Sequence, residues 1–238
     1  MHLSADALSA ANDPLEEHGD VGELLARHFH LHSQDMQQTL DSIVESATDV
    51  VEPAHFAGLI TVTRGHLIPR ATCGEPPYVL DVLQQQIGSG PCLSAAASQQ
   101  LVCIDDTLDE ERWVEFTVRA AELDVRSVIC LPLWVSDDVL GTLSLYSRDA
   151  RVFGPYLRLT EIFAAHAALA LATAQLVGQL RSALVNRDVI GQAKGILMER
   201  HRITADAAFQ RLSATSQATN RKLFEVCVAL AETGVLPG

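Results

Sequence analysis

Residues 187–200 read RDVIGQAKGILMER and open a segment of three short helical patterns that ends at Gly234. From Gly178 onward the chain carries eight Lys or Arg residues against five Asp or Glu, a net charge of +3. The other 177 residues carry nine against twenty-five, a net charge of −16, and the whole chain of 238 residues carries −13. This division predicts a polyanion-binding module joined to a part that does not bind polyanions.

Helical periodicity predicts the limits of three helices in the basic segment. The first ends at about Arg200, and Thr204 is a candidate N-cap for the second. Thr219 is a candidate N-cap for the third, which has an apolar stripe over 223–230. Gly234 is a natural C-terminal stop.

Residues spread over 40 positions of this segment carry a resemblance to a known family. They are Arg187, Ile190, the run from Ala193 to Met198, Ala207, Ala208, Leu212, Ser216, Asn220, Lys222 and Val226. In this pattern the segment resembles the ANTAR domain of bacterial transcription antiterminators. It departs from the family at Ser213, where Arg is common, and at Cys227, where Ala is common. The resemblance implies binding of paired hairpins in nascent RNA, which prevents a terminator stem from forming.

Polar side chains outside the apolar stripes are the candidate RNA contacts. Basic groups would contact phosphates, and amides and hydroxyls could read unpaired loop bases. A solvated helix surface explains any single Arg equally well, so the interpretation rests on the cluster. The candidates are Arg187, Gln192, Lys194, Arg200, Arg202, Arg211, Ser216, Asn220, Arg221 and Lys222.

Two alternatives stay open: a different function for the basic segment, and a purely structural role for its small residues. A DNA-binding helix-turn-helix would need a basic second helix, but residues 204–216 carry only Arg211. Small residues such as Gly191 and Gly195 are explained by close helix packing at least as well as by function, since Gly costs about 1 kcal/mol against Ala in a helix.

The first two thirds of the chain alternate between helical and extended patterns. Apolar periodicity predicts one or two helices over 21–51, then helices over 78–86 and 112–123. β-Branched and apolar runs predict a hairpin over 55–73, a strand over 101–104 and a second hairpin over 127–147. The near-continuous hydrophobic run of 127–135 indicates a strand that is covered on both faces.

This order of elements, with the segments Gly88 to Cys92, Val102 to Asp105, Ser127 to Pro132 and Val139 to Leu143, resembles a GAF domain. The resemblance implies an antiparallel sheet with helices on its faces and a pocket that accepts a small molecule. The residues expected to line the pocket are Cys73, Trp113 and Phe116. The alternative is an occluded pocket in a domain that serves only as a dimerisation scaffold.

Five cysteines at wide spacing without a CxxC motif fit a reducing cytoplasm, where a free Cys is a small buried hydrophobe. Enzymatic GAF relatives, the free methionine sulfoxide reductases, use thiols around the pocket. A thiol redox enzyme is therefore a third hypothesis, and its activity would depend on Cys92 or Cys103. The scattered histidines, including His28, His30 and His32, predict no metal site, and no motif indicates a cofactor.

A long helix is predicted after Pro155, because no further Pro occurs before Pro237. Leu169, Leu176 and Leu180 follow a spacing of seven and four that predicts a coiled-coil seam between two copies of the chain. The alternative is a helix that packs only on its own sheet. The stretch 162–180 lacks charged residues, but polar side chains interrupt it, so we expect a packed helix and not a membrane span.

Together these patterns predict an α+β protein: a GAF-like antiparallel sheet with flanking helices, followed by a long helix and an all-α three-helix ANTAR module. The expected organisation is a disordered or loosely attached tail over 1–20, a GAF sensor over 21–175 and an ANTAR RNA-binding domain over 178–236. We expect a cytoplasmic, non-enzymatic homodimer without a cofactor, whose partners are RNA hairpins and a possible small-molecule ligand of the sensor.

Overall fold

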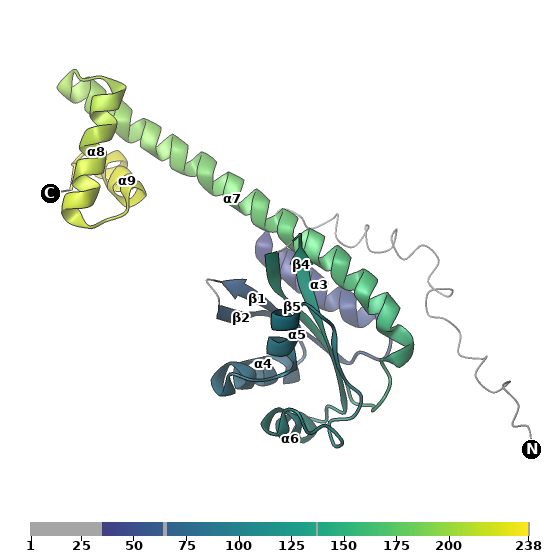
Figure 1. Cartoon of the computed structure of the whole chain (residues 1–238). Helices are drawn as coiled ribbons and strands as arrows, with labels where there is room; N and C mark the ends of the chain where they lie inside the picture. Colours follow the sequence, from purple (N-terminus) through teal and green to yellow (C-terminus); the bar gives the residue numbers. More distant parts are fainter. Residues whose placement is uncertain (1–34, 64–65, 137, 238) are drawn as a thin grey trace, which may run out of the picture. The chain divides into compact units, whose positions relative to one another are not determined.

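The structure, a computed structural model, describes residues 35–63, 66–136 and 138–237. It divides into two compact units between Gln175 and Leu176, and each unit is described by itself. One long helix, α7 (Leu157–His201), contributes its first part to the first unit and its second part to the other. Figure 1 shows the elements along the chain.

The first unit is built on a five-stranded antiparallel sheet in the order β2-β1-β5-β4-β3. Both predicted hairpins are confirmed, because β1 pairs with β2 and β4 pairs with β5. The middle strand, β5, joins the two hairpins by pairing with β1. The strands are β1 (Phe56–Thr63), β2 (His66–Cys73), β3 (Val102–Ile104), β4 (Ser127–Val135) and β5 (Asp138–Ser147).

Helices cover both faces of this sheet (Figure 1). α3 (Met36–Val50) represents the described part of the helices predicted over 21–51, and the rest of that range lies outside the described residues. The helices predicted over 78–86 and 112–123 are confirmed as α4 (Pro76–Ile87) and α6 (Val114–Glu122). An Ala-rich segment with no predicted structure forms α5 (Pro91–Ser98), which begins directly after Gly90.

The sheet separates two hydrophobic cores. On one face, Leu40 of α3 and Phe163 of α7 are buried in one cluster with Leu131 of β4. On the other face, Leu80 of α4 and Phe116 of α6 are buried in a second cluster, which β4 reaches through its alternate residues. The prediction that the strand over 127–135 is covered on both faces is therefore confirmed.

Gly141 of β5 marks a point where two backbones come unusually close. A Cβ at this position would lie 1.9 Å from the carbonyl oxygen of Ile60 on β1. No side chain can be accommodated there without separating β1 from β5, so this glycine is required by the strand pairing.

The second unit contains the last part of α7 together with α8 (Ala205–Thr219) and α9 (Leu223–Thr233). Its core is a small cluster of fully or nearly fully buried residues from all three helices. The members are Ala193, Leu197, Ala208, Leu212, Val226, Cys227 and Leu230.

Three of the four predicted helix boundaries in this unit are confirmed, the first of them by α7, which ends at His201. The Thr204 side chain accepts a hydrogen bond from the backbone N–H of Ala207, and Gly234 ends α9 with a left-handed φ of 70°. The cap predicted at Thr219 is wrong, because this residue forms the last turn of α8 and its hydroxyl donates to the carbonyl of Thr215. The reversal occurs at Asn220, and Lys222 precedes α9.

Among the described residues, one helical stretch, 154–201, has the length and apolar composition that crossing a membrane would require. One third of its apolar window is buried within the protein. The buried positions include Phe163, Ala167 and Leu171, which pack in the core beneath the sheet. These contacts are those of a core helix in the first unit.

Candidate functional site

Most of the predicted RNA contacts lie on the surface of the second unit. Eight of the ten have exposed side chains, and Lys194 and Ser216 are half-buried. The hydrophobic core is made from the opposite positions of the same helices, such as Ala193 and Leu197 of α7. The amphipathic pattern therefore leaves the basic side chains facing solvent.

Three of these candidates hold the fold of the second unit. Arg200 Nη1 donates to the carbonyl oxygen of Gly234 at 2.5 Å and so satisfies an acceptor at the end of α9. Ser216 Oγ donates to the carbonyl oxygen of Arg221 at 2.6 Å, across the turn between α8 and α9. Asn220 adopts the left-handed conformation that ends α8, with φ of 51°. The structure thus gives each of them a role that needs no RNA.

Arg202 and Arg221 form only loose ion pairs. Arg202 lies 3.9 Å from Glu199, and Arg221 lies 4.0 Å from Glu225. Exposed pairs of this kind are worth about 0–1 kcal/mol. Both guanidinium groups could therefore exchange their carboxylate for a phosphate at little cost.

The remaining candidates have no partner among the described residues. The side chains of Arg187, Gln192, Arg211 and Lys222 are exposed, and Lys194 is half-exposed. Their charge or amide groups are solvated in the free protein. These five residues are the ones that the structure leaves available for a polyanion.

Two glycines in the basic part of α7 also face solvent. A Cβ added to Gly191 or Gly195 would meet no atom within 4 Å. Close helix packing within the chain, which the sequence offered as an explanation at least as good as function, therefore does not occur at these two positions. It does occur at Ala193 and Ala208, which are fully buried.

The three residues predicted to line a sensor pocket are not brought together. Cys73 ends β2 and packs against the cluster that contains α3, with its sulfur 3.8 Å from Thr48 Oγ1. Phe116 is fully buried in the cluster on the other face, and Trp113 packs against that cluster. Because the sheet lies between the two clusters, no single pocket contains all three side chains.

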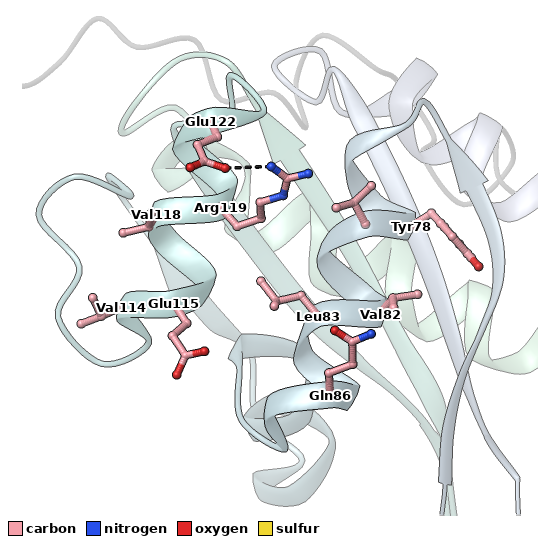
Figure 2. A pocket seen from close by; sticks show the side chains of 10 residues that line it. Tyr78, Val82, Leu83, Gln86, Val114, Glu115, Val118, Arg119 and Glu122 are labelled. Atoms are coloured by element: carbon pink, nitrogen blue, oxygen red, sulfur yellow. Dashed lines mark hydrogen bonds and ion pairs between the residues drawn. The ribbon is translucent and has the colours of Figure 1, made fainter.

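An apolar groove of about 650 Å³ lies instead between α4 and α6. Figure 2 shows Leu83 between the two helices and the ion pair of Arg119 with Glu122 along α6. Tyr78, Val114 and Val118 line it with more than half of their surface exposed. The sequence contained an indication of this groove. α4 has apolar residues on several sides, and only some of them, such as Leu80, are buried in the core.

The predicted seam residues of α7 are exposed in the single chain. Leu169, Leu176 and Leu180 retain 60%, 56% and 57% of their surface. Leu184 and Val185, which the predicted seam did not include, are also exposed. Such a row of large apolar side chains is unusual on a solvated helix.

The described residues contain no group of three or more His, Cys, Asp or Glu side chains placed to hold a metal ion.

Solved structures resemble the first unit in fold. The GAF domain of a phosphoenolpyruvate-protein phosphotransferase from Acinetobacter matches with a TM-score of 0.54 and 16% identity, covering 71% of this chain and 99% of that one. The corresponding GAF domain from Coxiella burnetii matches with a TM-score of 0.53 and 17% identity, covering 72% and 99%. Free methionine-R-sulfoxide reductase from Neisseria meningitidis, solved with its substrate, gives 0.53 and 16%, covering 74% and 97%. No curated protein sequence matches the chain significantly.

Family models match both units. The model of the GAF domain matches residues 33–172, and the model of the ANTAR domain matches residues 178–230. The first match covers more than half of the chain and contains the five-stranded sheet with its helices. The second covers the end of α7 and most of the two helices that follow. The chain therefore belongs to the GAF-domain family, with an ANTAR domain following the GAF domain.

Proposed function

We propose that this protein is an RNA-binding regulator of transcription antitermination, in which a GAF sensor controls an ANTAR domain that binds hairpins in nascent RNA. The domains would extend over 21–175 and 178–236, after a tail over 1–20. In this proposal the protein is cytoplasmic, catalyses no reaction and needs no cofactor. The observation that carries it is the set of exposed, unpartnered basic side chains on the ANTAR unit of an otherwise acidic chain.

The distribution of charge favours specific contact over general attraction. Residues 1–175 carry all of the −16 charge, so a nucleic acid is repelled from them and attracted only to the basic segment. Few aromatic side chains lie on the ANTAR unit, so phosphate contacts with amide readout of loop bases are the expected mode.

The proposal includes a homodimer held by the apolar row on α7. Leu169, Leu176 and Leu180 would pair with their copies, since each keeps a little over half of its surface exposed and burying that part is worth about 1–1.5 kcal/mol. Farther along the helix, Ile190 and Leu197 turn into the core of the ANTAR unit and are no longer available. A dimer would present two ANTAR units, which suits binding to paired hairpins.

The sensor would take a small, mainly apolar ligand in the groove between α4 and α6. The supporting observation is a lining of valine, leucine and tyrosine side chains with Arg119 and Glu122 at its side. Sites for small molecules have this composition, with few polar groups that fix orientation.

Gel-shift titration of the full chain tests the RNA proposal. The probes are a synthetic RNA with two tandem hairpins, the same RNA with one hairpin and a duplex DNA of the same sequence. We expect the tightest binding to the paired hairpins. Preference for the duplex DNA would support a helix-turn-helix protein and refute the proposal.

A salt series with a charge variant locates the contact. Replacing Arg187, Arg211 and Lys222 by Ala removes three phosphate contacts, each worth about 0.7 in the slope of log affinity against log salt. The advantage of the unmodified chain should therefore shrink about 20-fold when salt rises fourfold. Exposed Arg70 and Arg158 of the first unit, replaced by Ala, supply a control with lost charge but no lost contact. Effects in proportion to the lost charge, three against two, would show that net charge alone matters.

A further inference from the structure

Two cysteines far apart in the sequence meet inside the GAF unit. Cys92 lies in the first turn of α5 and Cys130 lies in β4, and both are fully buried. Their sulfur atoms are 3.4 Å apart, which is direct contact. Within the described chain, they are the two sulfur atoms recorded in contact, since Cys73, Cys103 and Cys227 lie elsewhere in the fold.

A polar cluster surrounds the Cys92 sulfur in the middle of an apolar core. Gln84 Nε2 donates a hydrogen bond to Cys92 Sγ at 3.1 Å, and the hydroxyl of Ser144 lies 3.0 Å from it. The backbone N–H of Cys92 donates in turn to Gln84 Oε1 at 2.9 Å. Packing alone does not require polar groups around a buried thiol, because burying them costs free energy unless they are satisfied.

These contacts make the two thiols chemically unequal. Hydrogen bonds from Cys130 first, and then from Ser144 and Gln84, lower the pKa of Cys92 to about 7 despite its burial. Burial and the neighbouring Cys92 raise the pKa of Cys130 well above its usual range. Of the two, Cys92 is thus the more acidic thiol and the better nucleophile.

A buried carboxyl group is placed to take the proton from Cys92. Cys92 Sγ donates to Asp81 Oδ1 at 3.8 Å, and the hydroxyl of Tyr146 donates to the same oxygen at 3.3 Å. Burial first, and then the nearby Cys92, raise the pKa of Asp81 well above its usual range. The second oxygen, Oδ2, has no hydrogen-bond partner among the described residues, so the carboxyl group has capacity to hold a proton.

We propose that Cys92 and Cys130 form a thiol–disulfide site that responds to hydroperoxides. The Cys92 thiolate attacks the terminal oxygen of the hydroperoxide, the O–O bond breaks and the thiolate becomes a sulfenic acid, while the proton that Cys92 lost and the leaving hydroxide or alkoxide form water or an alcohol. The Cys130 thiol then attacks the sulfenic sulfur, the S–S bond forms, and the sulfenic oxygen leaves as water. Two thiols and one hydroperoxide give one disulfide, one water and one water or alcohol, with two electrons passing from the sulfurs to the peroxide.

The geometry requires little movement for the second step. The sulfur atoms must close from 3.4 Å to about 2.05 Å, which is within reach of side-chain rotation. Entry of the peroxide to the sulfur atoms is the slower step, since both thiols are fully buried. α5 has eight residues, and its N-cap Gly90 has no side chain to hold the first turn, where Gln84 accepts from the N–H of Cys92. Local opening of this helix provides the entry for a small oxidant. The site stands independently of the proposed RNA function.

Peptide mapping of the full chain tests this inference. Trypsin leaves Cys73, Cys92 and Cys103 in one peptide, because no Lys or Arg lies between Arg70 and Arg112. A Cys73→Ser/Cys103→Ser variant therefore makes the assignment unambiguous. The reduced variant is treated with hydrogen peroxide, quenched in acid, blocked with N-ethylmaleimide and digested without reductant. We expect the peptide of Cys92 linked to that of Cys130, both thiols lost together, and full reversal by dithiothreitol.

Two comparisons sharpen the result. In the unmodified chain, burial and Asp105 raise the pKa of Cys103 to about 12, so this more exposed cysteine should keep its thiol while Cys92 reacts. In Cys130→Ser, Cys92 should stop at the sulfenic acid and be trapped by dimedone, with folding checked by circular dichroism. Oxidation of Cys73 or Cys103 while Cys92 keeps its thiol, or linkage of Cys92 to any cysteine other than Cys130, overturns the proposal even if Cys130→Ser does not fold.

Discussion

Replacing Gly191 and Gly195 of α7 by Ala should stabilise the protein and weaken RNA binding at the same time. Neither glycine has a left-handed backbone, and an added Cβ meets no atom within 4 Å. Each glycine costs a helix about 1 kcal/mol relative to Ala, so the double variant should gain about 2 kcal/mol in the free energy of unfolding. Since packing within the chain does not require glycine at these exposed positions, we infer that their role lies in contact with another molecule.

The proposed reason is close approach of an RNA backbone. Positions 187, 191 and 195 follow a spacing of four, and 194 is adjacent to them on the helix, so the glycines lie beside Arg187 and Lys194. Added methyl groups would hold the phosphates away from these basic side chains. We expect affinity for paired hairpins to fall about tenfold, equivalent to about 1.4 kcal/mol.

Urea unfolding and gel-shift titration measure the two effects separately. Both tryptophans, Trp113 and Trp134, lie in the GAF unit, so their fluorescence should follow an unchanged transition while far-UV circular dichroism shows the stabilised helices. Gly178→Ala is the matched control, because Gly178 is equally exposed on the same helix but lies outside the basic face. It should gain stability and keep full affinity. Stabilisation of the double variant with unchanged RNA affinity would refute the close-approach argument.

Three further outcomes are expected. Leu176→Asp with Leu180→Asp should convert dimers to monomers in sedimentation and weaken binding to paired hairpins, and an unchanged dimer would exclude α7 as the interface. Burial raises the folded-state pKa of Asp81 above its ordinary 3.8, so its stabilising contribution is full below that pH and is lost as pH rises toward the folded-state value. Asp81→Asn should therefore flatten the decline of unfolding free energy with pH in urea titrations, and a parallel profile would contradict the assignment. Arg200→Ala should lower the free energy of unfolding by about 1 kcal/mol through loss of its bond to Gly234, as thermal unfolding would show.

Local chemistry allowed the sequence to predict most of the secondary structure. Alternation and β-branching predicted both hairpins, and the cap at Thr204 and the stop at Gly234 were confirmed because each depends on neighbouring residues alone. The prediction at Thr219 was wrong, because a threonine can equally form the last turn of a helix. The charge division also lay in the sequence, since net charge needs no coordinates.

Contacts between residues that are distant in the sequence could be identified only from the tertiary structure. Cys92 and Cys130 are separated by 38 positions, and they meet because α5 packs on the face of β4 to which Cys130 points. Cys73 belongs to the opposite face of the same sheet from Phe116, although the sequence grouped them in one pocket. The face to which a strand residue points depends on its register, and a shift of one residue reverses it. The sequence therefore determined which elements form and where the charge lies, whereas strand register and helix packing decided which side chains meet.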